Sequence, residues 1–187
     1  MNVLTRTPRL AIALSLALLM AATRSRHFAG LLPDASLAVF LLGGFYLARA
    51  GWFAAYLALA ALVDQLAIRV GGVSDWCLTP AYAFLVPAYG FAWLAGRWAA
   101  IGFDAVSAAA LARTLAAFAV GVFGWFVVSN AGFYLYSGYF GEMAAAEYAA
   151  RVAKYLLPYT AAAAFYVVCA TAVHAAVAAA FGSLRRA

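Results

Sequence analysis

Six long apolar runs, separated by short polar interruptions, constrain this chain more than any single motif. They cover residues 9–23, 35–50, 52–70, 80–98, 105–128 and 155–181. A helix that crosses a bilayer needs about 20 mostly apolar residues, which is close to the length of most of these runs. With 69% hydrophobic and 10% charged residues, the chain is far more apolar than a water-soluble domain. The sequence therefore predicts an all-α integral membrane protein in which residues 1–187 form a single domain of six transmembrane helices.

The first run has two interpretations. Arg6 and Arg9 lie at its start, its apolar core is short, and Met20–Ala21–Ala22 weakly resembles a cleavage site, as in a cleaved signal peptide. The same run carries a small residue at every fourth position, which suits close packing of membrane helices. These small residues are Ala13, Ala17 and Ala21.

The run 52–70 contains polar side chains that are unusual inside a spanning helix, namely Asp64, Gln65 and Arg69. Ionisable groups at membrane depth usually face the bundle interior or a polar cavity. One interpretation therefore places Asp64 inside the bundle, where it supports a ligand pocket. The other is a helix-end cluster in which Arg69 extends to the membrane surface.

Charge favours one orientation in the membrane. The net charge of +6 is scattered and contains no run of lysine or arginine, so nucleic acid is a poor candidate partner. With six spans, seven of the twelve basic residues fall on the side of the chain termini. Positive charge is enriched on the cytoplasmic side, so we expect both termini to be cytoplasmic.

Most of the polar chemistry falls in the first, third and fifth loops, which would share the outer face. The side chains concerned are His27, Asp75, Trp76, Cys77, Asn130 and a group of tyrosines. Their convergence suggests a ligand pocket that opens outward. Tyrosine and tryptophan also gather at membrane interfaces as anchors, and His27 has an equally simple interpretation as a surface residue. Residues 142–154 predict a short interfacial helix.

Cys77 lies in the polar segment 72–80, outside the apolar runs. The only other cysteine, Cys169, falls near the middle of the last run, about 20 Å away along the membrane normal, so a disulfide is not expected. Cys77 is thus a free thiol that precedes a helix start, which favours the thiolate, whereas the neighbouring Asp75 opposes it. A free outward-facing thiol suggests a functional role, and packing beneath a ligand is the simpler alternative.

The segment Val73–Ser74–Asp75–Trp76–Cys77–Leu78–Thr79–Pro80–Ala81–Tyr82–Ala83–Phe84 resembles a known family. Together with Leu32–Pro33–Asp34–Ala35–Ser36–Leu37–Ala38 and Val128–Ser129–Asn130, it is similar to BtuM. BtuM proteins are small bacterial cobalamin transporters related to the S-components of energy-coupling-factor (ECF) transporters. The resemblance covers nearly the whole chain, and the cysteine segment is its specific part.

The resemblance implies a six-helix S-component-like bundle in the bacterial inner membrane, with a corrinoid site under the outer loops. It also implies that the thiolate of Cys77 binds the cobalt of cobalamin, the transported substrate, and cobalt accepts a soft thiolate ligand. Bound there, the thiolate would weaken a cyanide ligand on the opposite face and assist its loss. The candidate binding residues around Cys77 are Arg26, His27, Asp64, Asp75, Trp76, Tyr82, Ser129, Asn130, Tyr134, Tyr136 and Arg151. The aromatic and amide groups would contact the corrin, and Arg26 or Arg151 the nucleotide phosphate.

S-components of this kind dock on a separate membrane partner and two ATPases, partly through small residues of the first helix. Ala13, Ala17 and Ala21 would suit such docking. The sequence has no phosphate-binding loop motif, so any ATP hydrolysis would occur on another chain.

Two functions of other classes compete with transport. A membrane thiol oxidoreductase would use Cys77 as its redox centre, but the sequence lacks a CxxC pair. A haem or quinone anchor subunit would use histidines at matching depth, whereas His27 and His174 fall near opposite faces. A corrinoid spectrum retained after incubation with cobalamin would distinguish transport from both.

Overall fold

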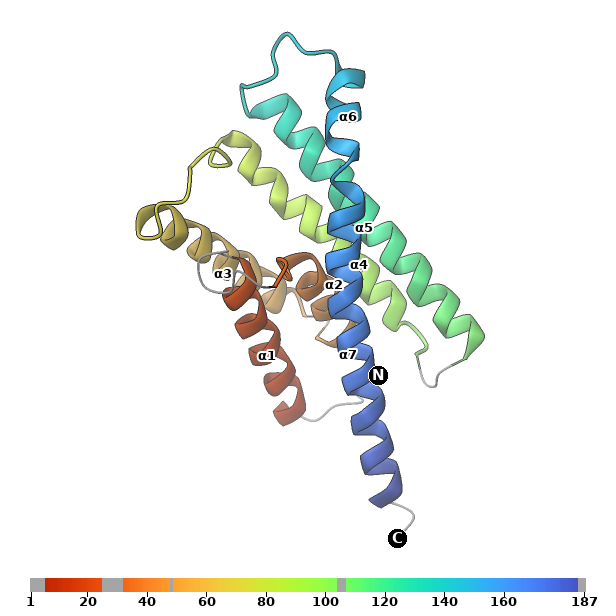
Figure 1. Ribbon diagram of the computed structural model, residues 1–187. Helices are drawn as coiled ribbons and strands as arrows, with labels where there is room; N and C mark the ends of the chain where they lie inside the picture. The colour runs from red at the N-terminus through yellow and green to blue at the C-terminus, as the bar shows by residue number, and fades with distance from the viewer. Residues whose placement is uncertain (1–5, 25–31, 48, 104–106, 185–187) are drawn as a thin grey trace.

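The computed structural model describes residues 6–24, 32–47, 49–103 and 107–184, which form helices and loops without a strand. The bundle contains α4 and α5 packed side by side, with α7 crossing them and α1 and α3 on the other flank (Figure 1). This confirms the all-α prediction. The elements in chain order are α1 (Arg6–Arg24), α2 (Ser36–Tyr46), α3 (Ala50–Arg69), the 3-10 helix η1 (Pro80–Phe84), α4 (Leu85–Ala100), α5 (Ala108–Tyr136), α6 (Ala145–Ala153) and α7 (Leu156–Leu184).

The short helix α2 forms the centre of the bundle. Every residue from Ser36 to Gly44 is buried, and α2 contacts α1, α3, α4, α5 and α7. At its middle, Phe40 is fully buried and its ring stacks on that of Tyr89 in α4, with 4.1 Å between the ring centroids. A helix that is apolar all round is the expected sequence for this position.

Glycines let α2 and α4 approach closely. A methyl group added at Gly44 would overlap the backbone of Trp93, and one added at Gly96 would overlap the carbonyl of Leu41. Small residues at helix interfaces are how membrane helices gain packing contacts where lipid supplies no hydrophobic driving force. The pair therefore depends on the absence of side chains at these two positions.

Three helices in the described residues are long and apolar enough to cross a membrane: Ala50–Arg69, Ala108–Tyr136 and Leu156–Val177. They expose large apolar side chains such as Leu115, Phe123 and Val173, which is unfavourable in water and normal in lipid. α5, with 29 residues, is about 44 Å long and exceeds the hydrocarbon thickness, so it tilts or extends beyond it. The structure is thus a helical bundle of membrane-protein type.

The prediction of six spans is not confirmed, because only three helices of the described residues are long and apolar enough to cross. α2 has 11 residues and rises about 16 Å, roughly half the hydrocarbon thickness, so it cannot cross alone. The predicted range 35–50 was too long because the helix ends at Tyr46 and α3 already begins at Ala50. Spans formed by α1 and α4 stay a prediction.

The end of α5 differs from the prediction. We expected the helix to stop at residue 128, but it continues to Tyr136. Ser129 and Asn130 donate their side-chain hydrogen bonds back to the carbonyl of Phe126, at 3.2 and 2.8 Å, and so are accommodated inside the helix. Gly132 packs against the ring of Phe84, which explains a glycine there without a helix end.

Two further boundaries follow from proline and charge. The predicted helix at residue 80 begins as η1, and α4 begins at Leu85, so Pro87 lies in the first turn of α4. A missing N–H breaks no helical bond there. The short helix predicted within residues 142–154 is confirmed as α6.

The glycine contact between α2 and α4 yields a stability prediction. Gly96→Ala should lower the free energy of unfolding by about 1–3 kcal/mol, because the added methyl overlaps the carbonyl of Leu41. Gly90→Ala is the matched control on the same helix, because nothing lies within 4 Å of its added methyl. It should be neutral or slightly stabilising. Thermal unfolding in detergent measures both, and equal effects would contradict the predicted contact.

Candidate functional site

Arg24, in the last turn of α1, connects α1 to three other helices through its guanidinium group. Its Nε and Nη2 atoms donate to the two carboxylate oxygens of Asp64 in α3, at 2.7 and 2.8 Å. Its Nη1 atom donates to the hydroxyl oxygens of Ser36 in α2 and Tyr89 in α4, both at 2.9 Å. A planar guanidinium suits this arrangement because its parallel N–H groups match the two oxygens of a carboxylate.

Asp64 also holds the segment that follows Cys77. The hydroxyl of Tyr82 in η1 donates to Oδ2 of Asp64 at 2.6 Å. Because η1 begins directly after loop 70–79, this bond fastens the end of that loop to α3. Asp64 therefore faces other helices, as one of the two sequence interpretations expects, and its support of a bound ligand stays a prediction.

Only 8% of the Arg24 side chain is exposed, so protein groups rather than water must stabilise its charge. A buried ion costs several kcal/mol unless a partner and hydrogen bonds compensate for the lost water. A second carboxylate, Asp34, accepts hydrogen bonds from the N–H and hydroxyl of Ser36 at 2.8 and 2.6 Å. We call Arg24, Asp64, Tyr82, Ser36, Tyr89 and Asp34 the arginine network.

Cys77 is exposed in loop 70–79, and its thiol is free. Partial burial raises the pKa of the thiol, the negative charge of Asp64 raises it further, and the positive charge of Arg24 lowers it. The net effect favours the protonated thiol, opposite to the effect expected from the helix start. Nearby, the Oγ1 atom of Thr79 is buried and lacks a hydrogen-bond partner among the described residues.

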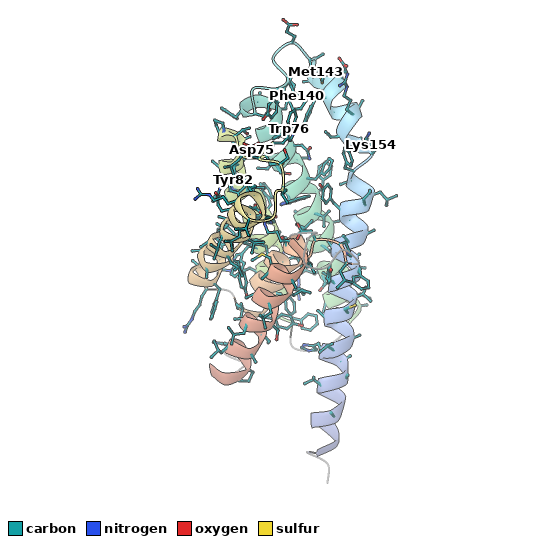
Figure 2. All side chains as sticks on the ribbon, turned by 60° about the vertical axis from the view of Figure 1, so that its left-hand side comes forward. Asp75, Trp76, Tyr82, Phe140, Met143 and Lys154 are labelled. Atoms are coloured by element: carbon teal, nitrogen blue, oxygen red, sulfur yellow. The ribbon has the colours of Figure 1, made fainter. Side chains whose placement is uncertain are left out.

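The residue before Cys77 connects two loops. The ring of Trp76 stacks on that of Tyr139, with 3.7 Å between centroids and 6° between the ring planes. The hydroxyl of Tyr139 also donates to the carbonyl of Trp76 at 3.3 Å. Figure 2 shows Trp76 at the same end of the bundle as Phe140 and Met143 of the α5–α6 loop. Loop 70–79 and the loop between α5 and α6 thus meet, as the convergence of the odd loops predicts.

The aromatic residues near the end of α5 mostly contact one another and neighbouring backbone. The hydroxyl of Tyr134 donates to the carbonyl of Met143 at 2.7 Å, and the ring of Tyr136 stacks on Phe84 with centroids 4.9 Å apart. Asn130 accepts from the hydroxyl of Tyr148 in α6 at 3.4 Å. These residues brace α5, η1 and α6 around the loops.

Other candidates lie apart from the arginine network. Arg151 pairs with Glu147 at 2.7 Å on the exposed face of α6, so its charge is already matched. Asp75 is exposed in loop 70–79. Arg26 and His27 lie outside the described residues.

A small apolar groove separates α3 from η1 and the start of α4. Its volume is about 140 Å³, room for a group the size of benzene. It is lined mainly by Leu57, Ala60, Ala61, Tyr82, Leu85 and Val86. A corrinoid is many times larger, so binding one requires the loops or helices around the groove to move apart. Within the described part of the chain, no three His, Cys, Asp or Glu side chains form a metal-binding group.

Sequence reasoning missed four contributors to this region: Arg24, Ser36, Tyr89 and Tyr139. Arg24 directly follows the first apolar run and was not among the candidate binding residues. The signal that could have found it is Asp64, an acid inside a predicted span that needs a cation at matching depth. Tyr139 belongs to the group of tyrosines that was expected near Trp76, but its pairing with that residue, 63 positions away in the sequence, could not be specified.

Partial burial of the Arg24–Asp64 pair, whose side chains are 8% and 24% exposed, yields a stability prediction. Arg24→Met should lower the free energy of unfolding by about 3–5 kcal/mol, because it leaves the Asp64 carboxylate without its cation. Arg151→Met is the matched control, because it removes an ion pair of the same 2.7 Å length whose side chains are 62% and 53% exposed. That change should cost less than about 1 kcal/mol. Similar losses in detergent unfolding would show that burial of the first pair is unimportant.

The electrostatics of Cys77 can be measured by alkylation in a Cys169→Ser background. Asp64→Asn removes a charge that raises the pKa of the thiol, so more thiolate forms and reaction with a maleimide at neutral pH should be faster. Arg24→Gln removes a charge that lowers this pKa, so the reaction should be slower. Rates that move in the same direction, measured on folded protein by mass spectrometry, would contradict this assignment.

Comparison with known proteins adds no further assignment. No protein-family model matches the chain, and no curated protein matches it. A function for this arrangement therefore has to be proposed from its residues.

Proposed function

We propose that this protein binds cobalamin at the end of the bundle that carries Cys77 and mediates its uptake across the bacterial inner membrane. The observation that carries the proposal is the free, exposed thiol of Cys77, set in the electrostatic field of Arg24 and Asp64. A corrinoid brings its own metal with four equatorial ligands, so the protein needs to supply only one axial ligand. A single soft thiolate is a suitable ligand for cobalt.

The raised pKa of Cys77 has a consequence for this step. The thiol is mostly protonated at neutral pH, so bond formation to cobalt releases a proton. Cobalamin binding should therefore strengthen as pH rises toward the pKa of the thiol. The unbound thiol is meanwhile less reactive toward oxidants than a thiolate would be.

The arginine network would position the groups beside the cobalt ligand. Asp64 and Arg24 hold Tyr82 at the end of the loop that carries Cys77. Asn130, Tyr134 and Tyr136 line the neighbouring end of α5, where amide and aromatic groups suit the rim of a corrin. Arg151 would have to leave Glu147 before it could bind a phosphate.

The proposal includes a change in the cargo. A thiolate on one axial position of Co(III) donates electron density and weakens the bond to a ligand opposite. Where that ligand is cyanide, it would leave as the anion with its electron pair. Cys77 would then assist decyanation while the substrate is captured.

Coupling to a separate ECF module is also a proposal. In this conformation the module could not dock on the small residues of α1, because they are not exposed. Ala13 is fully buried, and its carbonyl accepts from the hydroxyl of Tyr56 at 3.0 Å. Ala17 packs against the core, and Ala21 is half-buried. The exposed face of α1 instead presents Leu10, Leu14 and Leu18.

The cobalt-ligand role is tested with cyanocobalamin and purified variants. Cys77→Ser keeps the size but supplies a poor ligand, so affinity should fall by about 100-fold or more and the spectral change should disappear. Cys77→His supplies a competent ligand and should recover binding without thiol chemistry. Cys169→Ser is the matched control, because it removes the other free cysteine, on α7. An unchanged corrin spectrum and affinity in Cys77→Ser would refute the proposal.

The same thiol reports sidedness. With the termini in the cytoplasm, Cys77 faces the outside, and a membrane-impermeant maleimide should label it in intact spheroplasts. Labelling only after lysis would place this loop, and the site, on the inner face.

A further inference from the structure

Trp76 and Tyr139 lie face to face at the surface, next to the proposed cobalt ligand. Their ring centroids are 3.7 Å apart, their planes differ by 6°, and both side chains are exposed, by 51% and 43%. Each ring covers one face of the other, and the ring of Tyr139 also contacts those of Phe133 and Phe140, with centroids 6.0 and 6.4 Å away. Because Cys77 follows Trp76 directly, the stack begins one Cα spacing, about 3.8 Å, from the thiol-bearing residue.

The backbone around the stack can change the separation of the rings. Gly72 precedes Trp76 in loop 70–79 with φ of +66°, and Gly138 directly precedes Tyr139 with φ of +82°. Glycine tolerates this left-handed conformation and its alternatives, so each loop has a hinge on the chain side of its aromatic ring. The contacts between the two residues are the stack and one hydrogen bond of 3.3 Å from the Tyr139 hydroxyl to the Trp76 carbonyl.

Two parallel rings that move apart to twice their present separation, roughly 7 Å, accept one flat ring between them. Opening without a ligand would expose two aromatic faces to water. The empty pair therefore closes on itself, and a flat aromatic group replaces one stacking contact with two. Stacking on aromatic side chains selects a flat ring over a saturated group of similar size.

We propose that Trp76 and Tyr139 form an aromatic clamp that binds the flat heteroaromatic base at the end of a corrinoid's nucleotide tail. The inference rests on the proposed function, because it assigns a second subsite to the same ligand. Cys77 holds the metal, and the adjacent clamp holds the base.

Both subsites are needed if the sulfur of Cys77 replaces the base nitrogen as a ligand of cobalt. The thiol of Cys77 loses its proton, and its sulfur forms a bond to cobalt as the bond from the base nitrogen to cobalt breaks. The base nitrogen keeps its electron pair and takes up a proton from solvent, and the oxidation state of cobalt is unchanged. The displaced base is then a free aromatic ring, tethered to the corrin, that needs a place beside Cys77.

The test compares two probes in one set of variants: cobalamin, and cobinamide, which is the same corrin without the nucleotide tail. Binding to purified protein is measured by titration. In the unaltered protein cobalamin should bind more tightly. Trp76→Ala and Tyr139→Ala should each weaken cobalamin binding by about 5- to 10-fold, at the low end of the range for stacking because the self-stack is lost too. They should leave cobinamide affinity within two-fold.

Two controls separate the clamp from a general structural effect. Tyr139→Phe keeps the ring and removes only the hydrogen bond to Trp76, so cobalamin affinity should be retained or slightly improved. Trp98→Ala removes an exposed tryptophan at the far end of α4 and should affect neither probe.

Each contrary outcome has a distinct meaning. If the alanine variants weaken both probes equally, the stack only shapes the loop around Cys77, and the clamp is refuted while the proposed function stands. If the unaltered protein binds both probes equally and the variants change nothing, the base has no subsite here. If neither probe binds, the proposed function fails and the clamp assignment fails with it.

Discussion

The partly buried ion pair between Arg24 and Asp64 is the interaction on which this end of the molecule depends. A charged side chain that is 8% exposed has little water to stabilise it, so its surroundings must supply a matched carboxylate and oriented hydroxyls. Those partners come from α2, α3 and α4, and Asp64 extends the connection to η1 through Tyr82. Four helical elements are thereby held in one arrangement around the end of α1.

This network and the surface loops divide the region into a fixed part and an adjustable part. The fixed part is the arginine network, in which charge-assisted hydrogen bonds define the distances between side chains. The adjustable part is formed by loop 70–79 and the α5–α6 loop, which meet through one aromatic stack and one hydrogen bond. A thiol carried by the adjustable part but polarised by the fixed part combines access to a large ligand with a defined electrostatic environment.

Apolar run lengths and the charge pattern were enough to predict the helices and the short helix α6, and one of two interpretations placed Asp64 against other helices. The pairing of Arg24 with Asp64 was not predictable, because the position of Arg24 along the chain does not specify which carboxylate it contacts. The end of α5 was missed for a related reason. Ser129 and Asn130 look like helix-ending residues until their bonds to Phe126 are seen, and Gly132 is explained only by its contact with Phe84. Each missed feature depends on a contact made after folding.

The central position of α2 has a consequence for how the protein is assembled. An isolated helix of 11 residues spans only about half of the hydrocarbon thickness, so at least one of its ends would leave N–H or C=O groups where no water can bind them. Insertion machinery that recognises spans one at a time would therefore find α2 a poor substrate. The segment has to enter the bilayer together with its neighbours, already shielded by protein. We therefore expect α2 to become stable in the membrane only after the helices that surround it are in place.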